Sequence, residues 1–356
     1  MVRLTRVEQQ ARTRAAVLAA AREEFAEHGF GPAKVDRIAE RADLTRGAVY
    51  SNFPSKRALY LAVLIDLVEQ DSGTVAAVSP SSRADALGVF ARGWLERLPL
   101  AGDSAPGGRL QLRSLDGVFE DEPGPSVAAQ VARLEALLLA LALEEGGVMR
   151  CVRLAELVLT LLDGAGHRAA TAPGSGDPFD VAHACRHLAG IDLQDTWAPP
   201  HLPYVAPAQA CSDAWSPPAG LVDVISGSPV DVGHGLVVVL GAGRLGAAEE
   251  AVRSASPGEQ VVVAVVTGDP AETGRLVRLR LTDTVACLRR VFAVSSWPPV
   301  RLVLDDDARV ASAIGLAGAG DETESAVSVR DGLIVARSHG RGAGHAAGAH
   351  SREATP

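Results

Sequence analysis

The sequence predicts three structural units: a small helical unit at the N-terminal end, a larger all-helical unit, and an α/β unit. Three observations lead to this prediction. The chain has 356 residues, more than the 100 to 200 or so of one ordinary domain. Apolar residues recur with helical spacing up to about residue 191, and β-branched runs alternate with helical patterns from residue 236 onward. The stretch 198–220 between them is rich in proline and has no helical period, so it reads as an extended linker.

Composition favours a folded protein without a membrane span. Apolar residues make up 47% of the chain and charged residues 22%, which is not the profile of a disordered protein. The longest purely apolar run, 136–143, is flanked by Glu135 and Glu144 and is far shorter than the roughly 18 residues of a membrane helix. The N-terminal residues lack the apolar centre of a secretory signal, so a cytoplasmic location is expected.

The charge distribution indicates a nucleic-acid partner for one end of the chain. The net charge is −9, but residues 1–60 hold eleven Lys and Arg against seven Asp and Glu, whereas the remainder holds 23 against 36. A basic module attached to an acidic body is typical of a protein whose small end binds DNA.

The four cysteines are Cys151, Cys185, Cys211 and Cys287, and none belongs to a CxxC pair or a metal-ligand spacing. We therefore expect buried free thiols, no metal site and no cofactor. The alternative is a redox-sensing thiol, which requires a lowered pKa.

Three helices and the start of a fourth are predicted near the N-terminus. Leu18, Ala21 and Phe25 share one face of a helix over 12–30 that Gly29 ends. A short amphipathic helix follows over 35–42. Thr45 can cap a third helix over 46–53.

Pro54 ends the third helix, and Ser55 can cap the fourth. Lys56 and Arg57 at the start of that helix oppose the helix dipole, which makes a phosphate a suitable partner there. Two short helices joined by a tight turn form a helix-turn-helix, whose second helix enters the major groove, although an ordinary helical hairpin gives the same pattern.

The residues themselves resemble a known family. RAAVLAAAREEFAEHGFGPAKVDRIAERADLTRGAVYSNFPSKRALYLAVL is similar, almost end to end, to the DNA-binding domain of the tetracycline-repressor (TetR) family. It departs from the family pattern at Lys34, where Ser or Thr usually caps the second helix, and at Asp43, where the turn usually has Gly. Asp tolerates the left-handed conformation that such a turn needs.

The resemblance implies which residues contact operator DNA. Base edges are expected to face Arg46, Gly47 and Ala48, and phosphates to be held by Lys34, Thr45, Tyr50, Ser51, Asn52 and Lys56. Arg46 is the only one of these that can bind guanine through two hydrogen bonds, so we expect it to set specificity. Alternatively, Gly47 is small only to let its helix approach the preceding one.

Helices are also expected over 55–71, 81–98, 107–119, 124–145, 148–164 and 178–190. By resemblance, this unit would bind a small-molecule effector and form a homodimer through 148–162 and 178–191. Trp94, Arg113 and His167 are the candidate effector-pocket residues. The competing interpretation makes them a core residue, a solvated arginine and a helix-end cap.

The α/β unit is expected to have strands over 236–240, 261–266, 300–304, 326–329 and 333–336, with helices over 245–255, 271–292 and 308–316. Gly241, Gly243 and Gly246 fit the dinucleotide fingerprint, but the acidic residue that binds the ribose is not clearly present. The order of elements resembles a thioredoxin-like fold. Because no cysteine occupies the place of that family's CxxC, a redox-inactive domain is expected.

These observations divide the chain into 1–58 (helix-turn-helix), 59–196 (effector binding and dimerisation), 197–219 (linker), 220–340 (thioredoxin-like) and 341–356 (disordered tail). The function expected is that of a homodimeric, non-enzymatic repressor that a ligand releases from a palindromic operator. The alternatives are an oxidoreductase or nucleotide-binding protein acting through 220–340, or a regulator switched by oxidation of Cys151 or Cys185.

Overall fold

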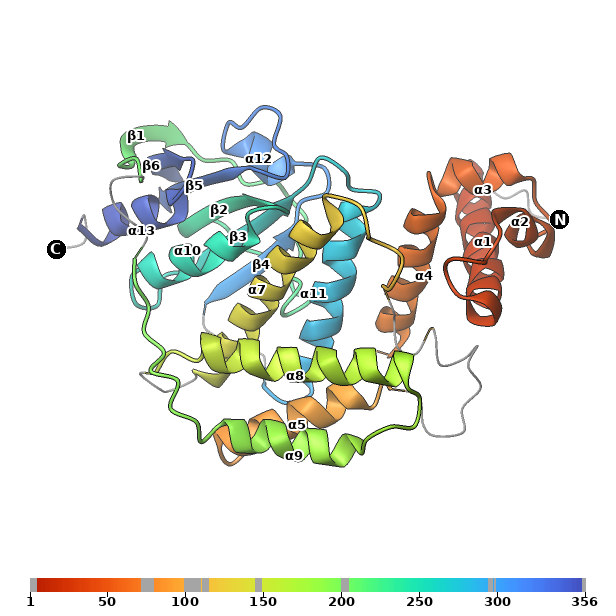
Figure 1. Cartoon of the computed structure of the whole chain (residues 1–356). Helices are drawn as coiled ribbons and strands as arrows, with labels where there is room; N and C mark the ends of the chain where they lie inside the picture. The colour runs from red at the N-terminus through yellow and green to blue at the C-terminus, as the bar shows by residue number, and fades with distance from the viewer. Residues whose placement is uncertain are drawn as a thin grey trace.

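The computed structural model describes residues 5–71, 80–98, 110, 115–144, 149–199, 205–293, 297 and 299–353. Figure 1 shows the first four helices at one end of the molecule and the sheet at the other. The helical part comprises α1 (Arg6–His28), α2 (Val35–Arg41), α3 (Arg46–Asn52), α4 (Lys56–Asp71), α5 (Arg83–Leu95), α7 (Gly124–Leu143), α8 (Val152–Thr171) and α9 (Pro178–Leu188). Most of the helix expected over 107–119 lies outside the described residues.

The α/β part is built on one six-stranded sheet with the order β1-β6-β5-β2-β3-β4. Strands β2, β3 and β4 are parallel, and β5, β6 and β1 continue the sheet in antiparallel fashion. The elements are β1 (Gln209–Ala214), β2 (Gly235–Gly241), η2 (Leu245–Ala247), α10 (Ala248–Ser254), β3 (Val261–Val266), α11 (Thr273–Arg289), β4 (Val300–Leu304), α12 (Arg309–Ala313), β5 (Glu324–Arg330), β6 (Leu333–His339) and α13 (Ala343–Glu353).

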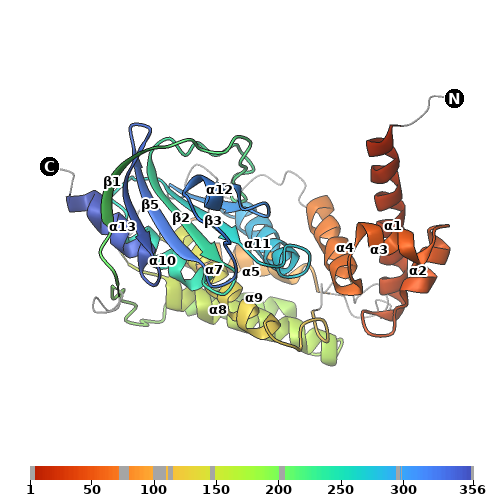
Figure 2. The same ribbon diagram turned by 90° about the horizontal axis from the view of Figure 1, so that it is seen from above.

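Both faces of the sheet are covered, which explains why β2 and β3 are continuous apolar runs with every residue buried. Successive side chains point to opposite faces. Val238 and Val263 join the core beneath α7, α10, α11 and α13, whereas Val237 and Val262 join a smaller core beneath α12 and the loops before β2. Figure 2 shows β1, β5, β2 and β3 side by side, with α1 to α4 set apart from the sheet.

Helix α7 joins the two larger parts of the molecule. It is apolar on almost every side, and α8 covers one side while α11, α10 and η2 cover the other. One hydrophobic core consequently runs from α1 to α13. By length and composition α7 is apolar enough to span a membrane, but 67% of its apolar window is buried inside the protein, as in a core helix.

Ion pairs between helices fix how α7 and its neighbours meet. Glu135 of α7 is 2% exposed and accepts two hydrogen bonds from Arg280 of α11, at 3.1 and 2.7 Å, and a third from Thr284 at 2.8 Å. Arg253 of α10 binds both oxygens of Glu144 just after α7, at 2.6 and 2.8 Å. The α/β part is therefore tied to the helical part in the middle of α7 and just after its C-terminal end.

Two expectations about irregular chain were wrong. The 197–219 stretch contains β1, which pairs with β6 at the edge of the sheet, because backbone pairing with a formed strand does not need β-branched side chains. The 341–356 tail contains α13, whose Ala343 and Ala347 are buried against β5, β6 and α10. Such a helix is hard to predict from sequence, because its small residues pack closely without forming a clear apolar stripe.

Replacing Glu135 with Ala is expected to lower the free energy of unfolding by about 3 kcal/mol, the lower end of the cost of breaking a buried ion pair. The lower end applies because Arg280 retains Asp163 at 3.7 Å. Urea denaturation measures the change. Glu156→Ala, on the exposed side of α8, is the control; an equal loss in both variants would contradict a special role for Glu135.

Replacing Gly344 with Leu is expected to destabilise the protein by about 1 to 3 kcal/mol through overpacking. A Cβ at Gly344 would lie 2.8 Å from the Cβ of Ala251, at the contact between α13 and α10. Gly320→Leu is the control, because nothing lies within 4 Å of a Cβ there. Equal melting temperatures for Gly344→Leu and the wild type would show that α13 does not dock in solution.

Candidate nucleic-acid interface

The first helix provides the base on which the next two sit. Thr5 and Glu8 form a capping box at its start, and Gly29 ends it with φ 74°. Arg41, the last residue of α2, pairs with Glu24 and Glu27 of α1 at 3.4 and 2.5 Å. Although Glu24, Glu27 and His28 could group around a cation, Arg41 already neutralises these carboxylates.

The turn between α2 and α3 has the geometry expected from the sequence. Asp43 adopts a left-handed conformation with φ 53°, so it substitutes for the usual glycine. Lys34 occupies the N-cap of α2 but makes no side-chain capping bond there. Its backbone N–H instead donates to Glu24 Oε1 at 3.1 Å, and its side chain is exposed.

Helix α3 is attached to the domain by one face only. Thr45 caps it by accepting a hydrogen bond from the Ala48 N–H at 3.2 Å, and Val49 is its one buried residue. The exposed outer face carries Arg46, Gly47, Tyr50 and Ser51. A short helix with a polar, solvent-facing surface can enter the major groove without losing its own packing.

The guanidinium of Arg46 is weakly held and available for exchange. It pairs with Asp36 at 3.3 Å, but both side chains are about 60% exposed, and such surface pairs contribute about 0 to 1 kcal/mol. It also lies over the Tyr50 ring, 5.5 Å from the centroid. A hydrogen-bonding interaction with Tyr50, followed by the charge of Asp36, raises the pKa of Arg46, which therefore stays cationic.

Gly47 faces open space. A Cβ built there would have Thr45 Oγ1, at 3.9 Å, as its only neighbour. The alternative that Gly47 is small to let α3 approach the preceding helix is therefore wrong. No contact among the described residues requires a glycine at this position.

Like Thr45, three more of the expected phosphate ligands already make side-chain contacts within the protein. The side chains of Ser51 and Asn52 both donate to the Ala48 carbonyl at 2.9 Å. The ammonium of Lys56 donates to the carbonyls of Gly31 and Ala33 at 3.0 and 3.3 Å, and burial lowers its pKa. Lys56 thus also holds the loop between α1 and α2 in place.

The expected effector residues do not meet in one cavity of the described structure. Trp94 lines a small cavity of about 70 Å³ between α5, α7, α8 and α11, with Arg97 stacked 4.6 Å from its ring centroid. His167 is exposed on α8. Arg113 lies outside the described residues. As it stands, the Trp94 cavity is smaller than the 300 Å³ or so of a typical ligand site.

The glycines of the dinucleotide fingerprint have another role. A Cβ at Gly241 would lie 2.2 Å from the Asp321 carbonyl oxygen, and one at Gly243 would lie 2.9 Å from that same oxygen. Gly246 packs on α7, where its N–H donates to Gln130 at 2.9 Å. Protein therefore fills the space that a pyrophosphate would need.

The cysteines do not have the environment of reactive thiols. Cys151, Cys185 and Cys287 are buried, Cys211 is partly buried, and all four are free. Burial raises the pKa of Cys151 and raises that of Cys185 to about 11. Because a redox sensor needs a lowered pKa, the oxidation alternative for these two residues is disfavoured.

Sequence reasoning missed the contact between α4 and α11. Both the hydroxyl of Ser55 and the guanidinium of Arg57 bind Glu272 at the start of α11. Arg275 of α11 donates to the Ala58 carbonyl at 3.1 Å. A cleft of about 660 Å³ opens beside this contact, between α1, α4 and α11. No local pattern signals a contact across more than 200 residues.

Comparison with known proteins gives matches to regulators. Residues 17–63 match the family model of bacterial regulatory proteins of the tetR family. No match was found among curated proteins. Similar solved structures include a transcriptional regulator from Rhodococcus (24% identity over 51% of this chain and 96% of that chain, TM-score 0.35) and a putative one from Streptomyces coelicolor (26%, 49% and 97%, TM-score 0.31).

A third similar structure is NalD, the secondary repressor of the MexAB-OprM multidrug efflux pump in Pseudomonas aeruginosa (21% identity over 50% of this chain and 95% of that chain, TM-score 0.34). The matched residues run from within α1 to within α4. They include α2, α3, the turn at Asp43 and the Thr45 cap of α3. The chain therefore carries, at its N-terminal end, the DNA-binding domain of the TetR family of bacterial transcriptional regulators.

Proposed function

We propose that this protein is a sequence-specific transcriptional regulator that inserts α3 into the major groove of its operator. The observation that carries the proposal is the outer face of α3. It combines an exposed, weakly paired Arg46 with open space over Gly47, in the segment that matches the tetR family. Open space over a helix surface allows bases to approach closely.

Arg46, Gly47 and Ala48 would face base edges, and Arg46 would form two hydrogen bonds to guanine. The phosphate ligands would be Lys34, Thr45, Tyr50, Ser51, Asn52 and Lys56. The ion pair with Asp36 costs little to break, so Arg46 can exchange it for a base. Phosphate contacts would then set the register, and Arg46 would set the sequence.

The functional unit proposed is a homodimer joined through α8 and α9. Apolar side chains are exposed on these helices, where Leu157 is 38% and Phe179 is 73% exposed. A two-fold contact there would place two copies of α3 on successive turns of a palindromic operator. This arrangement follows the division of the chain into DNA-binding (1–58), dimerisation (59–196) and α/β (220–340) units.

The regulator would act in the cytoplasm as a repressor released by a small molecule. An effector changes operator affinity only to the extent that it binds the DNA-competent and the splayed dimer with different affinity. No catalytic role is proposed for any residue.

The α/β part is proposed to be a redox-inactive thioredoxin-like domain. Supporting this, β2, α10, β3, α11 and β4 are followed by the β5–β6 hairpin and α13 in that order. The turn after β2 has Gly243 to Gly246, with no cysteine, where such a domain would carry its reactive cysteines. Its role would be to complete the core around α7 and to contact α4.

Arg46→Ala is expected to weaken operator binding by about 5- to 150-fold, because a base contact of this kind is worth about 1–3 kcal/mol. Tyr50→Ala removes a phosphate contact and is expected to weaken binding to a similar degree on every DNA sequence. The operator is first selected from random duplexes, and affinity is then measured at several salt concentrations. Arg341→Ala is the control, since Arg341 is exposed after β6 in the α/β part and its replacement makes the same change in net charge as Arg46→Ala. The dimer, measured by light scattering, should persist. Unchanged operator affinity in both α3 variants would refute the proposal.

Gly47→Leu is expected to abolish specific binding while keeping or slightly raising the melting temperature. Leu favours a helix more than Gly by roughly 0.5–1 kcal/mol, and the free protein has room for the side chain. In the complex, the same side chain would occupy the space of the bases. Circular dichroism gives the melting temperature. A variant that is destabilised, or that still binds with wild-type affinity, would contradict this placement of Gly47.

A further inference from the structure

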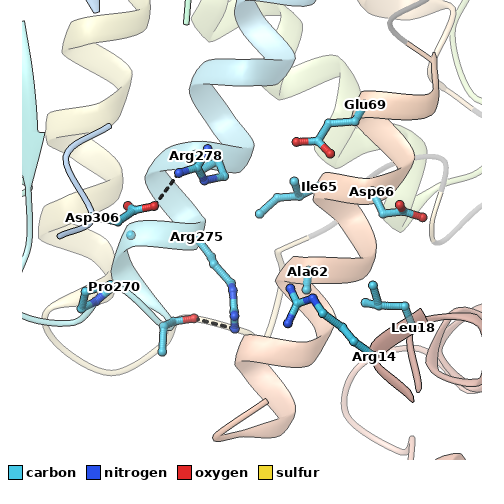
Figure 3. A pocket seen from close by; sticks show the side chains of 12 residues that line it. Arg14, Leu18, Ala62, Ile65, Asp66, Glu69, Pro270, Arg275, Arg278 and Asp306 are labelled. Carbon is cyan, nitrogen blue, oxygen red and sulfur yellow. Dashed lines mark hydrogen bonds and ion pairs between the residues drawn. The ribbon is translucent and has the colours of Figure 1, made fainter. Parts of the chain in front are cut away.

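A cleft of about 660 Å³ separates the DNA-binding helices from the α/β part. One wall comes from α1 and α4, and the other from α11, the loop before it, and Asp306 after β4 (Figure 3). Its volume lies in the range of small-molecule sites, about 300–1,000 Å³. Neither Trp94 nor His167, the described residues that were expected to bind an effector, lines it.

The lower end of the cleft in Figure 3 carries two guanidiniums, those of Arg14 and Arg275. Both lie over the buried ring of Phe53, at 4.5 and 5.6 Å from its centroid. Among the described residues, neither has a carboxylate within ion-pair distance. Arg275 uses one nitrogen on the carbonyls of Ala58 and Ala271, both at 3.1 Å.

The charge of Arg275 is only partly compensated. Burial lowers the pKa of Arg275, and the charge of Arg14 lowers it further, which the more distant carboxylates of Asp306 and Asp269 do not fully offset. By contrast, Arg278 on the same helix is compensated, since it pairs with Asp306. An anion placed between Arg14 and Arg275 would relieve the repulsion and accept charge-assisted hydrogen bonds.

The rest of the cleft limits what such an anion can be. Ala62 and Ile65 line its middle and Leu18 lies beside Arg14, and these three side chains suit an apolar body. Beyond them, Asp66 binds the Gln70 amide at 2.6 Å, and Glu69 is exposed. These two carboxylates disfavour a second anionic group at that end.

We propose that this cleft binds a small organic anion, with its carboxylate or phosphate group between Arg14 and Arg275 and its apolar body against Leu18, Ala62 and Ile65. Arg14 belongs to the DNA-binding domain and Arg275 to the α/β part, so the ligand bridges the two. A second consequence rests on the proposed function. The bound anion fixes α4 against α11 and thereby changes the affinity for operator DNA, by about 5- to 150-fold if the coupling is typical of allosteric proteins.

The test uses full-length protein and three probes at constant ionic strength in chloride buffer: phenyl phosphate, benzoate and inorganic phosphate. Calorimetry is expected to detect binding of at least one of the two organic probes, and tighter binding of phenyl phosphate than of inorganic phosphate. Comparing the affinities for phenyl phosphate and benzoate shows whether the site prefers a phosphate or a carboxylate group. Failure of both organic probes to bind, or equal affinity for inorganic phosphate and phenyl phosphate, would overturn the proposal.

Arg14→Gln and Arg275→Gln are each expected to weaken binding of the organic probe by at least about tenfold, which is the loss of one charge-assisted contact. Arg12→Gln, on the same helix but outside the cleft lining, makes the same charge change and should bind as the wild type does. Arg14 is exposed, so its variant remains informative even where Arg275→Gln fails to fold. Wild-type affinity in Arg14→Gln would place the anion elsewhere.

Operator binding is measured separately, with and without the organic probe. A protein that binds its operator but none of the organic probes refutes the cleft and leaves the regulator intact. A protein that binds the probe but enriches no DNA sequence supports the cleft and refutes the proposed function.

Discussion

The burial of α7 is the constraint on which the rest of the structure depends. Six leucines of this helix are buried: Leu134, Leu137, Leu138, Leu139, Leu141 and Leu143. At roughly 1.5–3 kcal/mol each, an upper estimate, their burial contributes a free energy as large as the whole net stability of a typical domain, about 5–15 kcal/mol. A helix that is apolar all round must be covered all round. Helix α8 covers one side, and only the α/β part covers the other.

This constraint explains the charged residues at the contact. A carboxylate such as Glu135 within an apolar layer is costly unless it is paired and hydrogen-bonded, and Arg280 and Thr284 meet that need together. Arg280 lies on α11, the helix that also reaches α4 through Arg275. The rigid element that completes the core thus extends to the helix that carries the DNA-binding domain. A change on the α/β side has a direct physical route to α3.

The glycines after β2 show how one sequence pattern serves two physical purposes. A glycine permits any close approach of backbone, whether by a pyrophosphate or by another strand of the same chain. Here the approaching group is the loop at Asp321, so Gly241 and Gly243 complete the fold. The thiols are a similar case. Sequence gives their spacing, but the burial that raises the pKa of Cys185 comes from the packing of α9 against its neighbours.

The sequence by itself determined the DNA-binding end of this protein. Its helices are ended, joined and capped by residues that act on neighbours within a few positions: Gly29, Asp43, Thr45 and Ser55. Their effect can therefore be predicted from the local sequence. The buried strands β2, β3 and β4 could be predicted for a similar reason, since each is a short apolar run. Only the tertiary structure decided that β1 pairs with β6, that α13 docks on α10, that α7 is shared, and that Arg14 meets Arg275. Each of these joins residues far apart in the chain, where the pairing depends on shape and burial that no local pattern records.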